Sequence, residues 1–146
     1  MRCHEIMKRR VQCAVAGASV ADVARQMEEH DLGFLPVRTA AGEVVGVVTD
    51  RDLALGVCAR GLGADTRVEE VMARLIVACK PDDPVAHAEQ LMSRYGVHRV
   101  LILDRERHLA GVVSLTDVAQ CEEPLRLARL VRDIASHEYR VESSHG

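Results

Sequence analysis

Aromatic side chains are nearly absent from this sequence: its 146 residues include one phenylalanine, two tyrosines and no tryptophan. Hydrophobic residues still make up 48% of the chain, so we expect a packed interior built from aliphatic side chains. No apolar run approaches the roughly 20 residues of a membrane span, and the first ten residues lack the apolar stretch of a secretory signal. We therefore expect a cytoplasmic protein without a membrane partner.

Excess charge and paired cysteines are also missing. The net charge of −3 gives no general attraction to nucleic acid, so we expect no nucleic-acid partner. The five cysteines are odd in number and no two form C-x-x-C, which disfavours a disulfide framework and a cysteine-rich zinc site. Buried reduced thiols are the favoured interpretation, and we predict no metal ligands. Redox-active or metal-binding cysteines remain an alternative, with Cys3 and His4 as first candidates.

The common catalytic motifs do not occur. The sequence contains no G-x-S-x-G, no phosphate-binding G-x-x-x-x-G-K-[ST] and no H-E-x-x-H. Its seven histidines are scattered along the chain. We therefore predict no catalytic residues and no enzyme activity. Binding, followed by a shift between conformations or assembly states, is the expected mechanism.

What the sequence does contain is a long internal repeat. GVVTDRD at residues 46–52 returns as GVVSLTD at residues 111–117, so a glycine, two valines, a hydroxyl and an aspartate recur 65 residues apart. EIM at residues 5–7 returns as EVM at residues 70–72 in the same register. Two copies are too few for a solenoid. We predict two related subdomains that pack against each other.

Both copies predict the element order β-α-β-β-α, and hence an α+β fold. In the first copy, apolar residues recur at helical spacing from Val20 to Met27, after Ser19 as a suitable N-cap. In the second copy, Gly96 is typical of a helix stop. Each copy begins with a short apolar stretch and ends with a second helix. The main predicted strands are 34–37, 44–49, 99–103 and 109–114.

A C-terminal extension follows the second copy. Two glutamates before Pro124 are typical of a helix start. The apolar stripe of this helix consists of Leu127, Leu130, Val131 and Ile134. The predicted boundaries are 2–64 for the first repeat, 67–121 for the second, 122–139 for the helical extension and 140–146 for a flexible tail.

Residues 2–121 resemble a tandem pair of CBS domains, of the stand-alone bacterial type. The resemblance is carried by the duplicated G-V-V-[ST]-x-x-D, by the helix before each copy of it, and by GVHRVLILD at residues 96–104. It implies two repeats packed with pseudo-two-fold symmetry, to which the sequence adds the C-terminal helix. It also implies a regulatory module that senses an adenine nucleotide (AMP, ADP or ATP) or an S-adenosylmethionine-like ligand in the cleft between the repeats. The module would act on an unknown protein partner or on its own assembly, as a homodimer, and would require no cofactor.

The resemblance also assigns roles to particular residues. It implies that the two motif aspartates bind the hydroxyls of a ribose. It also implies that the side-chain hydroxyls three residues earlier contact a phosphate or the ribose. Val97-His98-Arg99 resembles the γ subunit of AMP-activated kinase, in which the histidine and arginine hold the phosphates. The first copy has no basic residue there, so Arg51 is an alternative cation. The candidate nucleotide-binding residues are Asp117, Ser114, Thr116, His98, Arg99, Asp52, Thr49, Arg51, Val97, Ile76 and Val77.

Purely structural interpretations of the same residues are also open. [ST]-x-x-[DE] before a helix is also a capping motif, so both aspartates can simply satisfy N–H groups of their own helices. His98 and Arg99 can be an exposed strand start, and Arg51 an exposed helical arginine. For the whole chain, the alternatives are a ligand-independent structural or dimerisation module, and a metal- or redox-responsive protein that uses cysteine and histidine.

Overall fold

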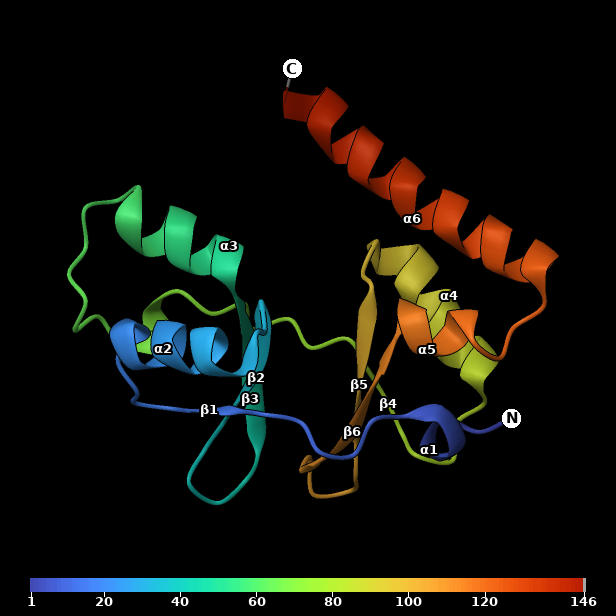
Figure 1. Cartoon of the computed structure of the whole chain (residues 1–146), viewed down its shortest axis with the longest axis horizontal. Coiled ribbons are helices and arrows are strands. Elements are labelled where there is room, and N and C mark those ends of the chain that lie inside the picture. Colours follow the sequence, from blue (N-terminus) through green and yellow to red (C-terminus); the bar gives the residue numbers. More distant parts are fainter. Residues whose placement is uncertain (146) are drawn as a thin grey trace. The chain divides into compact units, whose positions relative to one another are not determined.

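The computed structural model describes residues 1–145, and the side chains of residues 1–137. The chain forms two compact units (Figure 1). The central unit is Gln12–Ile76, and the terminal unit joins Met1–Val11 to the chain from Val77 onward. The predicted repeat boundaries of 2–64 and 67–121 follow chain order, whereas in space the first eleven residues belong to the unit of the second repeat.

The central unit contains a three-stranded sheet in the order β1-β2-β3. Strand β1 pairs parallel to β2, and β2 pairs antiparallel to β3. Alternate residues of β3 are buried, as expected for a strand with one face on the core. The elements are β1 (Ala14–Val15), α2 (Val20–His30), β2 (Phe34–Arg38), β3 (Val44–Thr49), α3 (Asp50–Leu53), a π-helical turn η1 (Ala54–Cys58) and a 3-10 turn η2 (Val68–Glu70).

The terminal unit repeats this topology with a sheet in the order β4-β5-β6. Both sheets shift register at the same place, between Val37 and Arg38 and between Ile102 and Leu103. The predicted α+β class and β-α-β-β-α order are therefore confirmed. The elements are α1 (Cys3–Ile6), β4 (Ala78–Cys79), α4 (Val85–Tyr95), β5 (Arg99–Leu103), β6 (Leu109–Ser114), α5 (Leu115–Ala119) and α6 (Pro124–His145).

Local signals explain where the two long repeat helices begin and end. The Ser19 hydroxyl accepts a hydrogen bond from the Asp22 N–H at 3.1 Å and caps α2, as predicted. Helix α4 ends at Gly96, whose φ of 64° is left-handed, so the predicted stop is also confirmed. Their apolar faces supply Val23 and Met92, among other residues, to aliphatic cores.

The two leading segments, residues 1–11 and residues 64–76, each pair with the sheet of a unit in the same way. Lys8 and Val112 exchange backbone hydrogen bonds of 2.9 and 3.0 Å in the terminal unit. Ala73 and Val47 do the same in the central unit, at 2.8 and 2.9 Å. The two pairs are related by the repeat period of 65 residues. In each unit, the sheet therefore forms backbone hydrogen bonds with the segment that precedes the other repeat in the sequence.

Helix α6 packs on α4 within the terminal unit (Figure 1). Leu130 and Ile134 are 5% and 2% exposed and join the core, whereas Val131 is 45% exposed. The predicted stripe was therefore wrong at Val131, because the position that follows Leu130 lies 100° further round the helix. The predicted flexible tail begins at residue 140, but the helix continues to His145; Gly146 lies outside the described residues.

Candidate nucleotide-binding site

In the central unit, β3 runs directly into a capping box. The Thr49 hydroxyl accepts from the Asp52 N–H at 3.1 Å, and the Thr49 N–H donates to Asp52 Oδ2 at 2.9 Å. The capping interpretation of the sequence motif is thus what the structure shows here. Asp52 and Thr49 are half-buried, and Arg51 is exposed.

The same capping box follows β6 in the terminal unit, at the start of α5, and has one additional hydrogen bond. Ser114 donates twice to Asp117 Oδ2, from its N–H at 2.8 Å and from its hydroxyl at 2.9 Å, and the hydroxyl accepts from the Asp117 N–H at 3.1 Å. The Asp117 side chain is 9% exposed, and Lys8 Nζ lies 3.9 Å from its other oxygen, Oδ1. The carboxylate is therefore fixed through one oxygen and faces a cation with the other.

Sequence reasoning missed Lys8. It follows the repeated EIM motif, and its equivalent after EVM is Ala73, so the repeat itself gives no signal for a lysine. Lys8 reaches Asp117 only because the leading segment pairs with Val112, two residues before Ser114. The side chain is 70% exposed, which leaves most of the ammonium group in water.

Two of the predicted basic residues lie next to this box. Arg99 pairs in register with Ser114 across β5 and β6, and the backbone carbonyl of His98 accepts from the Leu115 N–H at 2.8 Å. Both side chains are exposed, as is that of Thr116 on α5. The structure therefore brings Ser114, Asp117, His98 and Arg99 to one end of the sheet.

The corresponding end of the central sheet has a different composition. Phe34 pairs with Thr49, and the Gly33 carbonyl accepts from the Asp50 N–H at 3.0 Å, so Gly33 occupies the position of His98. Arg51 is the predicted cation on this side. The two units are therefore unequal: one has a histidine, an arginine and a lysine near its capping box, and the other has Arg51.

The predicted apolar contacts for a base are spread between the units. The Val77 carbonyl accepts a hydrogen bond from the Leu101 N–H at 3.0 Å. The side chains of Val77 and Val97 pack against the core of the terminal unit. Ile76 is the last residue of the central unit and is half-buried. Val77 and Val97 thus keep partly exposed apolar surface on the terminal unit.

A groove of about 400 Å³ lies between α4 and α6, and no sequence motif pointed to it. Glu89 is 7% exposed there, and Arg126 Nη2 lies 3.3 Å from its carboxylate. Burial and the neighbouring Glu122 raise the pKa of Glu89 to about 7, against the opposing effect of Arg126. The two glutamates therefore share one proton more readily than two exposed carboxyls do.

The CBS-domain profile matches residues 3–57 and 68–122. The chain belongs to the CBS-domain family. The first CBS domain carries Thr49 and Asp52, and the second carries Ser114 and Asp117. The CBS domain-containing protein YhcV of Bacillus subtilis is 33% identical over 115 residues, which are 79% of this chain and 81% of that protein. Several other relatives are longer enzymes, of which this CBS pair spans about a fifth to a quarter.

Three solved structures show the same fold. The CBS domain protein PAE2072 of Pyrobaculum aerophilum, complexed with AMP, has a TM-score of 0.75 at 25% identity and covers 90% of this chain and 99% of its own. The CBS domain pair of MJ0100, complexed with 5-methylthioadenosine and S-adenosyl-L-methionine, has a TM-score of 0.72 at 25% identity, with coverages of 82% and 94%. Hypoxic Response Protein I, with two coordinated zinc ions, has a TM-score of 0.76 at 25% identity, with coverages of 84% and 100%.

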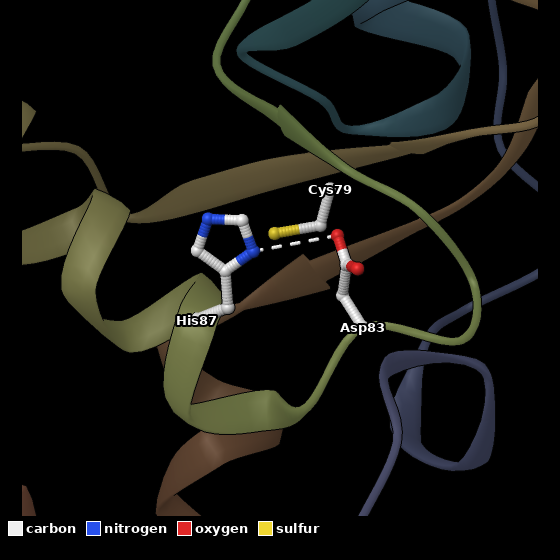
Figure 2. A group of neighbouring side chains, drawn as sticks. All are labelled: Cys79, Asp83 and His87. Atoms are coloured by element: carbon white, nitrogen blue, oxygen red, sulfur yellow. Dashed lines mark ion pairs between the residues drawn. The ribbon is translucent and has the colours of Figure 1, made fainter.

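A second side-chain cluster lies in the second CBS domain, where the sequence predicted no metal ligand. The ligand atoms of Cys79, Asp83 and His87 all lie within 4.8 Å of one another (Figure 2). His87 Nδ1 is 3.3 Å from Asp83 Oδ2, and the Lys80 N–H donates to the same oxygen at 2.8 Å. Burial raises the pKa of the Cys79 thiol to about 12, so the thiol is neutral while no metal is bound.

Among the described residues, no helix combines the length and the apolar character needed to cross a membrane.

Proposed function

We propose that this CBS pair is a regulatory module that binds an adenosine-containing ligand of the AMP, ADP, ATP or S-adenosylmethionine class. The signal then passes to a protein partner or to the assembly state of the module itself. The proposal contains no catalytic step, because binding alone changes the relative stability of the conformations. A cytoplasmic location, expected from the sequence, and a homodimer, implied by the resemblance to the family, are part of this proposal.

The arrangement around Asp117 carries the proposal. Ser114 holds one carboxylate oxygen with two hydrogen bonds, and the second oxygen has Lys8 at 3.9 Å. A ribose presents two hydroxyl donors, and a carboxylate oxygen that is already fixed in place accepts from them without a further loss of side-chain freedom. The cap and the ligand contact therefore use different oxygens of one carboxylate and are compatible.

The basic residues of the second CBS domain favour a phosphorylated or otherwise anionic ligand there. Arg99 and His98 lie at the same sheet end as Ser114, and Lys8 reaches the box from the leading segment. An arginine fork meets two phosphate oxygens at once. We therefore assign the tighter binding to the second CBS domain and a weaker contribution to Thr49, Arg51 and Asp52.

A thermal-shift panel on the full chain with AMP, ADP, ATP and S-adenosylmethionine tests the proposal. A ligand at 100 times its Kd stabilises the folded chain by about 2.7 kcal/mol, which raises the melting temperature by several degrees. Asp117→Asn keeps a carbonyl oxygen for the Ser114 N–H but replaces the other acceptor with a donor. We expect binding about 10- to 100-fold weaker and little change in the melting temperature without ligand.

Asp52→Asn is the matched control, since it makes the same change in the other capping box. We expect a smaller loss of affinity from it than from Asp117→Asn. If no ligand in the panel shifts the melting temperature, the ligand-independent structural module replaces this proposal. If Asp117→Asn binds as tightly as the parent chain, Asp117 is a cap only.

A further inference from the structure

The cluster at the start of α4 combines three kinds of metal donor from three consecutive pieces of chain. Cys79 ends β4, Asp83 lies in the turn that follows, and His87 lies in the first turns of α4. Figure 2 shows the Cys79 sulfur directed at the His87 ring, with the Asp83 carboxylate beside both. An ion pair between a helix-start aspartate and a histidine four residues later is common by itself, but it does not account for a buried thiol directed at the same point.

The backbone holds these donors in place. Cys79 is 4% exposed and pairs with Ile102 in the sheet. The Lys80 N–H donates to Asp83 Oδ2 at 2.8 Å and so fixes this oxygen 3.3 Å from His87 Nδ1. The side chains of Asp83 and His87 are 28% and 45% exposed, so an ion can enter from solvent.

The distances suit a small tetrahedral ion. Zinc binds imidazole nitrogen and carboxylate oxygen at about 2.0 to 2.2 Å and thiolate sulfur at about 2.3 Å, so two of its N and O ligands lie about 3.3 to 3.5 Å apart. The His87 Nδ1 to Asp83 Oδ2 distance is already 3.3 Å. The sulfur lies within 4.8 Å of both, whereas a thiolate and an N or O ligand of one zinc ion lie about 3.6 Å apart, so the sulfur needs to approach by at most about 1 Å.

A fourth donor lies next to this cluster. The Cys3 thiol is within hydrogen-bonding reach of Cys79 and is fully buried. Helix α1 carries it there, because the Cys3 N–H donates to the Asp83 carbonyl at 2.8 Å and the His4 N–H to the Pro81 carbonyl at 3.0 Å. A bound ion would therefore also attach the leading segment to the second CBS domain.

The geometry points to a zinc site in the second CBS domain, in which Cys79, Asp83 and His87 bind the ion and the Cys3 thiol beside Cys79 is the candidate fourth ligand. Sulfur and imidazole donors favour zinc over magnesium or calcium, which take oxygen ligands. The site is formed from residues outside the candidate nucleotide-binding set, and its test needs no nucleotide.

The experiment uses the full chain, treated with a chelator and kept reduced with a phosphine that does not bind metal. Zinc is then titrated in, and cobalt(II) replaces it for absorption spectroscopy. We expect one ion per chain and a thiolate-to-cobalt charge-transfer band. Asp83→Asn and His87→Gln change side chains that are 28% and 45% exposed, and each is expected to lower the zinc affinity by at least about 100-fold, the upper range for loss of a supporting residue.

Two control variants separate this site from its competitors. His108→Ala disrupts the exposed Asp104, Glu106 and His108 cluster, and Cys58→Ser removes an exposed thiol; both are expected to bind zinc as the parent does. Cys3→Ser is expected to keep the stoichiometry and weaken binding. The inference is overturned if no zinc binds, if the cobalt spectrum lacks a thiolate band, or if His108→Ala rather than His87→Gln abolishes binding.

Discussion

Two glycines of the repeat are explained by the closeness of a neighbouring backbone. A Cβ on Gly111 would lie 2.7 Å from the Lys8 carbonyl oxygen and 2.7 Å from the Met7 sulfur. On Gly46 it would lie 2.7 Å from the Ala73 carbonyl oxygen and 2.8 Å from the Met72 sulfur. The glycine of G-V-V is therefore required because each leading segment packs directly on it.

Gly111→Ala is accordingly expected to destabilise the terminal unit by about 1 to 3 kcal/mol, the usual cost of forcing an extra methyl group into a packed site. Urea unfolding of the full chain measures this loss. Gly63→Ala is the control, because its Cβ meets only the end of the flexible Asp65 side chain. Equal, small losses from both variants would contradict the packing explanation.

At the scale of elements, α4 and α6 are joined by both apolar and charged contacts. Leu130 and Ile134 pack into the core of the terminal unit, and the Ser93 hydroxyl of α4 donates to Asp133 at 2.8 Å. Glu89 lies at the same junction with Glu122 and Arg126 around it. Because its pKa is raised from 4.5 to about 7, the folded chain retains this proton better than the unfolded chain does.

The sign of the pH dependence follows from that difference. The contribution of Glu89 is fully present below about pH 4.5 and is lost as the pH rises through about 7. Glutamine does not titrate, so the Glu89→Gln variant does not undergo this loss as the pH rises. We therefore expect its free energy of unfolding, relative to that of the parent chain, to be more favourable at pH 8 than at pH 5. The net difference is about 1 to 2 kcal/mol, because the pKa of Glu122 is lowered and offsets part of it.

Urea unfolding at both pH values, in chelator so that no metal contributes, measures this difference. The exposed neighbour Glu123→Gln is the control and is expected to show no such pH dependence. A Glu89→Gln variant with the same effect at pH 5 and pH 8 would rule out the shared proton.

At the scale of the whole molecule, the two leading segments each complete the unit of the other repeat. Met7 joins the core of the terminal unit and Met72 that of the central unit. The Val112 N–H donates to the Lys8 carbonyl, and the Val47 N–H donates to that of Ala73. The chain therefore crosses between its units twice, near Val11 and near Ile76.

Met7→Ala and Met72→Ala test this exchange against each other by amide hydrogen exchange. We expect Met7→Ala to reduce protection at Val112 and to leave Val47 protected, and Met72→Ala to do the reverse. Each loss is about 2 to 5 kcal/mol, as for other methionines truncated in a core. Loss of protection at Val47 in Met7→Ala would show that each leading segment stays with its own repeat.

The sequence by itself determined the repeat, the element order and most helix and strand ends, including Ser19 and Gly96. These features depend on hydrophobic periodicity and on caps, which are set by residues a few positions apart. It also determined the [ST]-x-x-D motif, but not whether the aspartate caps, binds a ligand or does both, since the same spacing serves either purpose.

Only the tertiary structure decided the rest. It placed Lys8 at Asp117 through a backbone pairing across more than 100 residues, a contact that no local pattern encodes. It also brought Cys79, Asp83 and His87 together. Their spacing of four residues spans a strand, a turn and a helix, so the directions of these side chains depend on how the turn is folded against α1 rather than on any single periodicity.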